Sequence, residues 1–89
     1  MESTMDLLDR ALNTHTIPYW TEKLDLSRNA LYTSKMRGHL SPAIAGCLAE
    51  ALEEDVQNWI AIAALESERD SACKQHLLKR MGNRVKSRF

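Results

Sequence analysis

The chain has 89 residues, 44% of them hydrophobic, and its 12 basic and 12 acidic side chains leave no formal net charge. This length suits one domain with a single modest core, and the hydrophobic content excludes a disordered chain. Without a run of about 18 apolar residues or a signal-peptide pattern, we expect a cytoplasmic protein that contacts no membrane. Two cysteines, Cys47 and Cys73, are too few for a disulfide framework.

The first predicted helix begins at the N-terminus of the chain. Ser3 or Thr4 can cap it, and Asp6 and Asp9 favour its positive N-terminal end. Apolar residues at helical spacing form an inward stripe. They are Met5, Leu8, Ala11 and Leu12.

A short helix, a tight turn and a second helix are predicted next. Residues 17–24 form the first of these helices, with Thr16 as its cap. Asp25 can take a left-handed turn conformation, and Leu26 points inward. Ser27 is then expected to cap a helix over residues 28–36, which Gly38 ends.

Two further helices follow. Ser41 and Pro42 are a strong start signal for a helix that runs to about Glu53, with Ile44, Ala45, Leu48 and Leu52 inward. Asp55 caps the next helix, in which Val56, Trp59, Ile60, Ala63 and Leu65 supply bulk. We expect Trp20 and Trp59 to lie in the core.

Charge is distributed unevenly along the chain. Residues 26–49 hold three bases and no acid, residues 50–70 hold seven acids and one base, and residues 71–89 hold six bases and no acid. Local charge sets the field at a phosphate backbone, so a neutral total is compatible with DNA binding.

The run from Trp20 to Arg28, with Arg37-Gly38 and Leu40-Ser41-Pro42 after it, resembles the lambda-repressor/Cro-type helix-turn-helix family over about residues 3–65. The resemblance implies an all-α, five-helix bundle with the turn motif between the second and third helices, followed by a C-terminal helical extension. The chain departs from the family pattern at Thr21 and Asp25, and in placing Gly38 eleven residues after Ser27. We expect a DNA-binding domain over residues 1–68, an extension over 69–82 and a flexible basic tail over 83–89.

The family implies that the helix after the turn enters the DNA major groove. Base contacts are then expected from Arg28, Asn29, Tyr32 and Thr33, and phosphate contacts from Lys35, Arg37 and His39. Solvation of these side chains, and burial of Tyr32, are the alternatives.

The sequence offers little for catalysis or for metal binding. Cys73-x-x-His76 is the one pairing with metal-ligand spacing, and no second pair accompanies it. There is no nucleophile elbow and no glycine-rich phosphate loop. We therefore expect no enzyme, no cofactor, no metal and no small-molecule ligand.

Dimerisation is predicted from apolar residues beyond those that a five-helix core needs, unless these fold back on the first helix. They are Ile62, Leu65, Leu77, Leu78 and Met81. The leading function is a phage-type repressor that binds operator DNA as a homodimer. The alternatives are a protein-interaction module, such as an antitoxin or an anti-repressor, and a sequence-neutral DNA binder that uses the basic tail.

Overall fold

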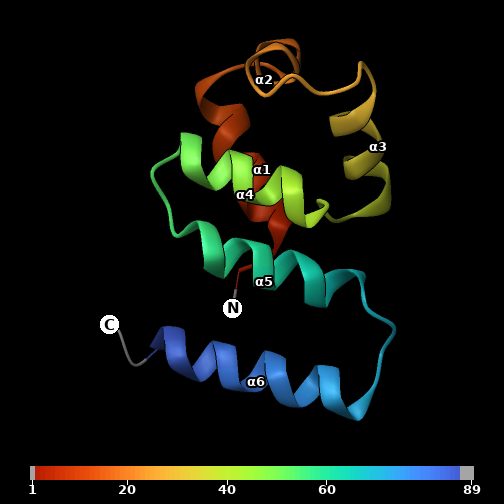
Figure 1. Ribbon diagram of the computed structural model, residues 1–89, viewed down its shortest axis with the longest axis vertical. Helices are drawn as coiled ribbons and strands as arrows, with labels where there is room; N and C mark the ends of the chain where they lie inside the picture. The colour runs from red at the N-terminus through yellow and green to blue at the C-terminus, as the bar shows by residue number, and fades with distance from the viewer. Residues whose placement is uncertain (1, 87–89) are drawn as a thin grey trace.

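A computed structural model describes the backbone of residues 2–86 and the side chains of residues 2–81. This part of the chain forms six helices and no strand, which confirms the all-α expectation (Figure 1). The helices are α1 (Thr4–Thr14), α2 (Ile17–Lys23), α3 (Ala30–Arg37), α4 (Pro42–Ala51), α5 (Val56–Ser67) and α6 (Ala72–Lys86).

Four of the predicted helix starts are confirmed by capping hydrogen bonds. The side chains of Ser3, Thr16, Ser41 and Asp55 each accept a hydrogen bond from the backbone amide three residues later. At Ser3 the bond is reciprocal, because the Asp6 carboxylate also accepts from the Ser3 amide at 2.8 Å. Each cap satisfies an amide that the first helical turn would otherwise leave without a partner.

The end of α2 has the left-handed residue that the sequence predicts. Asp25 has φ 52°, and its amide donates to the Glu22 carbonyl at 3.1 Å. The Leu26 amide donates to the Thr21 carbonyl at 2.9 Å, which completes a Schellman motif. This motif closes α2 and reverses the chain toward α3.

The predicted start of α3 is wrong by two residues. The helix begins at Ala30 with Asn29 at the N-cap position, and Ser27 does not cap it. The reason is a tighter turn, in which the Ala30 amide donates to the Ser27 carbonyl three residues back. Gly38 ends the helix at φ 82°, as expected.

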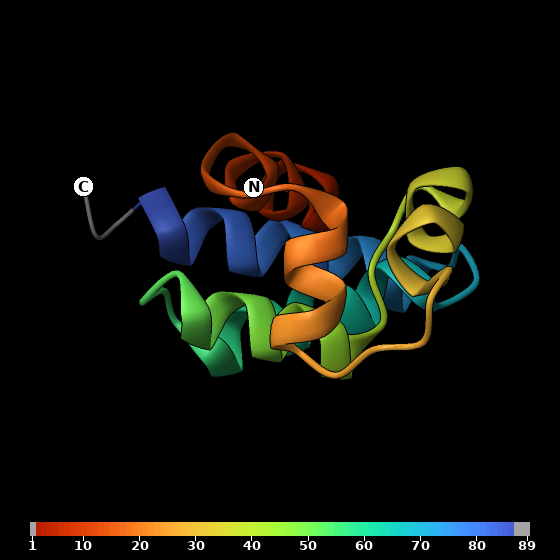
Figure 2. The same cartoon turned by 90° about the horizontal axis from the view of Figure 1, so that it is seen from above.

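The core lies between α1, α4 and α5, whose arrangement Figures 1 and 2 show. α2 packs on this core through the side chain of Trp20. The Trp20 indole N–H donates to the Ala11 carbonyl at 2.8 Å, which ties α2 to α1. Trp20 and Trp59 are each 3% exposed, so their expected place in the core is confirmed. Fully buried apolar side chains also include Leu7, Leu31 and Leu40.

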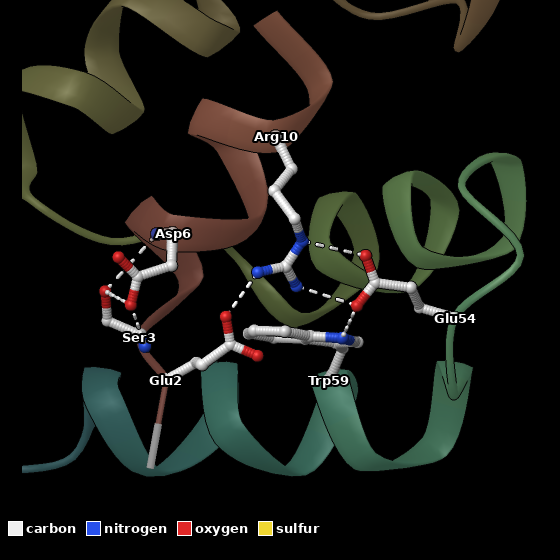
Figure 3. Close-up of polar contacts among 6 residues, drawn as sticks. All are labelled: Glu2, Ser3, Asp6, Arg10, Glu54 and Trp59. Carbon is white, nitrogen blue, oxygen red and sulfur yellow. Dashed lines mark hydrogen bonds and ion pairs between the residues drawn. The ribbon is translucent and has the colours of Figure 1, made fainter. Parts of the chain in front are cut away.

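A polar cluster joins α1 to the corner between α4 and α5 (Figure 3). Arg10 donates to both carboxylate oxygens of Glu54, at 2.7 and 3.0 Å, and also pairs with Glu2. The Trp59 indole N–H donates to Glu54 Oε1 at 3.1 Å, and the Arg10 guanidinium lies over the Trp59 ring. The hydrogen bond to Glu54 is the main cause that raises the pKa of Arg10 above its ordinary value.

The helical extension differs from the sequence expectation at its C-terminal end. α6 continues through Gly82 to Lys86, where we expected an irregular tail, because one glycine costs a helix only about 1 kcal/mol. The rest of the predicted tail, residues 87–89, lies outside the described residues. The dimerisation set also needs correction, because Ile62 is 2% exposed and belongs to the core.

The other four residues of that set are divided between core and surface. Leu65 and Leu78 are half-buried, and Met81 packs against the core of its own chain. Leu77 is 43% exposed and is the member of the set that α6 presents to solvent.

Candidate nucleic-acid interface

α3 lies at one side of the molecule, and Figure 1 shows α2 and α3 on the opposite side from α6. Leu31 and Ser34 are the buried side chains of α3, and its other residues are exposed or half-buried. An open cleft lies on each side of the helix, one toward α2 and one toward α4.

The cleft between α2 and α3 has a volume of about 580 Å³ and brings together three of the four predicted base-contact residues. Arg28, Asn29 and Tyr32 line it, and the Tyr32 side chain is 50% exposed. Glu22 and Asp25 line the same cleft, so it combines one guanidinium with two carboxylates. Arg28 and Asn29 precede the first turn of α3 rather than lying within it.

The cleft between α3 and α4 has a volume of about 500 Å³ and a different chemistry. Thr33, Arg37 and His39 line it, so the fourth predicted base-contact residue lies with two of the predicted phosphate-contact residues, and Asn29 lines both clefts. Further hydroxyl groups come from Ser27, Ser34, Ser41 and Ser67. None of the described residues that line this cleft is acidic.

One feature favours an anion in the second cleft. Ser41 and Pro42 place the N-terminal end of α4 at its wall, where the helix dipole is positive. His39 lines this cleft and also a third one that contains Glu2 and Glu66, and its Nδ1 atom is buried and has no hydrogen-bond partner among the described residues. Lys35, the remaining predicted phosphate-contact residue, is exposed on α3 and lines neither cleft.

Sequence reasoning missed the acidic wall of the first cleft and the hydroxyl-rich wall of the second. The left-handed turn predicted at Asp25 was a usable signal for the acidic wall of the first cleft, because such a turn directs the chain after α2 back toward α3. The serine contributions had no signal, since Ser41 and Ser67 come from other helix ends and meet α3 only in the fold.

The described residues show no metal-binding group of three or more His, Cys, Asp or Glu side chains. No helix between residues 2 and 86 has both the length and the apolar character that a membrane crossing requires. Comparisons of the chain with protein-family models, with curated proteins and with solved structures return no match.

Proposed function

We propose that this protein is a sequence-specific, double-stranded DNA-binding transcription regulator, of the phage-repressor type, that binds its operator as a homodimer. The observation that carries this proposal is the arrangement of the two clefts around α3. Arg28, Asn29 and Tyr32 meet in one cleft, and Arg37 and His39 meet in the other. In this proposal α1–α5 form a helix-turn-helix bundle of the lambda-repressor kind, and α6 is an extension.

The charges of the two clefts favour one orientation of a duplex. Glu22 and Asp25 repel phosphate from the cleft between α2 and α3. The same carboxylates can accept hydrogen bonds from the amino groups on base edges. In that cleft Arg28 is suited to guanine and Asn29 to adenine. The acid-free cleft with Arg37 and His39 suits the phosphate backbone. Base edges would therefore lie toward α2, and the backbone toward α4.

Selection of bound sites from a random duplex pool tests the proposal directly. Arg28→Ala should weaken binding to the selected site by about 5- to 150-fold relative to random DNA, since a good bidentate contact contributes about 1–3 kcal/mol of discrimination. Arg37→Ala should weaken both equally and lower the log–log salt slope by roughly 0.9. Arg69→Ala, on the exposed connection before α6, is the matched control for lost charge. Failure to enrich any sequence would refute the proposal.

The homodimer is proposed because one helix-turn-helix unit reads few base pairs, and two-fold pairing doubles the site. Leu77, exposed on α6, is an apolar side chain available for such a contact, and Met36 and Ile60 are also exposed. Sedimentation should then show two chains per selected site, and one chain per site would exclude the dimer.

A protein-interaction module is the second candidate function, favoured by the exposed carboxylates of Glu50 and Glu53 at the corner between α4 and α5. These would suit a basic protein partner, as an antitoxin or an anti-repressor requires. Co-purification of a stoichiometric partner, with no enriched DNA sequence, would favour this function. Equal binding to selected and random DNA would instead favour a sequence-neutral binder.

A further inference from the structure

Thr4, the first residue of α1, joins three segments that are far apart in the sequence. Its side chain is fully buried, and its hydroxyl donates a hydrogen bond to Glu66 Oε1 near the end of α5. Its backbone amide donates to Glu66 Oε2 at 2.9 Å. The same hydroxyl accepts a hydrogen bond from the Leu40 amide, also at 2.9 Å. The start of α1, the end of α5 and the connection after α3 therefore meet at one oxygen atom.

After α3, the chain is anchored to the rest of the protein through the hydrogen bond of the Leu40 amide to Thr4. Gly38 ends α3 in a left-handed conformation, His39 follows, and Leu40 is fully buried. α3 itself has few anchors, because Leu31 and Ser34 are its buried side chains and the Ser34 hydroxyl donates to a carbonyl of its own helix. The direction of α3 therefore depends strongly on where its two connections are held.

We propose that Thr4 is a positioning residue for α3: its hydroxyl, oriented by the Glu66 carboxylate, holds the Leu40 amide and thereby sets how α3 and His39 are presented. Where DNA binding is concerned, this inference rests on the proposed function. The statement that the Thr4 hydroxyl holds the connection after α3 does not depend on DNA binding.

A hydroxyl is required here for a chemical reason. The Thr4 oxygen donates to one partner and accepts from another, which neither a methyl group nor an ammonium group can do. A buried backbone amide that loses its acceptor is costly, so the connection moves or opens when the hydroxyl is removed. The Glu66 carboxylate accepts from both donors of Thr4, which fixes the direction of the hydroxyl proton.

Thr4→Val and Thr4→Ser form a matched pair for the test. Valine keeps the shape and removes the hydroxyl, whereas serine keeps the hydroxyl and removes a buried methyl group. We expect Thr4→Val to speed hydrogen exchange of the Leu40 amide by about tenfold or more relative to the Leu48 amide in α4. It should also shift the amide resonances of Gly38 and His39. Thr4→Ser should leave both readouts close to those of the parent protein.

If substitutions at Thr4 act only through core packing, Thr4→Ser will change Leu40 exchange and the amide resonances more than Thr4→Val does. That result would overturn the inference. Unchanged Leu40 exchange in Thr4→Val would overturn it as well. Glu66→Gln is the second variant and serves if Thr4→Val does not fold, because the amide cannot accept both donors and should move the same resonances. Glu68→Gln, exposed beyond the end of α5, should move none of them.

The DNA measurement then separates this inference from the proposed function. Thr4→Val should weaken binding to a selected duplex about tenfold more than binding to a random duplex, and Thr4→Ser should not. If the amides of Thr4→Val shift and the ratio of the two affinities stays constant, Thr4 does not position α3 for recognition. If the parent protein selects no sequence, the proposed function fails and the amide results still decide the role of Thr4.

Discussion

Removing the Glu54 carboxylate tests whether the cluster in Figure 3 holds α1 against the corner between α4 and α5. Glu54 receives two hydrogen bonds from Arg10 and one from the indole of Trp59. Glu54→Ala removes all three, whereas Glu54→Gln retains an acceptor for the indole but loses the charge. Glu50→Ala removes an exposed carboxylate four residues before Glu54 that is not part of this cluster, and it is the matched control.

The expected magnitudes follow from burial. The side chains of Arg10 and Glu54 keep 36% and 29% of their exposure, so their ion pair contributes about 1 kcal/mol. The Trp59 side chain is nearly fully buried, and its orphaned indole N–H adds about 1–2 kcal/mol to the cost of Glu54→Ala. We therefore expect losses of about 2–3 kcal/mol for Glu54→Ala and about 1 kcal/mol for Glu54→Gln, against under about 0.5 kcal/mol for Glu50→Ala.

Urea denaturation at pH 7, followed by circular dichroism and by tryptophan fluorescence, measures these differences. Since the pKa of Arg10 is raised in the folded protein, its contribution is fully present at pH 7 and is lost on the alkaline side only as the pH rises above the ordinary value of an arginine. A loss of about 2 kcal/mol should lower Tm by about 10 °C. Equal stabilities of Glu54→Ala and Glu50→Ala would refute the reasoning.

Two further predictions concern the contact between α4 and α5 and the turn that joins them. A Cβ atom at Gly46 would lie 3.0 Å from Ile60 Cγ1, so Gly46→Val should cost about 2 kcal/mol in urea denaturation. Glu53 has φ 58°, which strains a residue with a Cβ atom, so Glu53→Gly should raise the free energy of unfolding by about 0.5 kcal/mol and raise Tm. A lower Tm would show that the turn stores little strain.

Four helix starts were predictable from the sequence because each of their caps is a local interaction, whereas α3 has no side-chain cap and its start was misplaced. The side chains of Ser3, Thr16, Ser41 and Asp55 bond amides three residues away, and a short window of sequence contains both partners. The left-handed turn at Asp25 is local in the same way.

Contacts between distant segments were not predictable. Thr4 looked like an alternative cap for α1, yet its partners are Leu40 and Glu66. Ile62 looked like surplus apolar surface, yet the arrangement of α1, α4 and α5 places it in the core. In both cases the periodicity of a helix shows which residues share a face but not what that face meets.

The candidate site was predicted in part. Arg28, Asn29 and Tyr32 line one cleft, as residues expected to act together should, but Thr33 lies in the other. Consecutive helical residues are about 100° apart around the axis, so Tyr32 and Thr33 point toward different sides of α3 and line different clefts.

The charge of α6 makes a prediction about the proposed dimer. Arg80 is exposed three residues after Leu77, on the same face of α6, so two copies of α6 that pack together through Leu77 would bring like charges close. Salt screens such repulsion, with a Debye length of about 10 Å at 0.1 M and about 3 Å at 1 M. A dimer through α6 should therefore become tighter as salt rises, while DNA binding becomes weaker because the release of counterions from DNA is less favourable at higher salt. Sedimentation of the free protein in low and high salt checks this, with Leu77→Ser as the variant that should stay monomeric. A dimer that weakens with salt would instead place its contact between the bases of α6 and the carboxylates of a second copy.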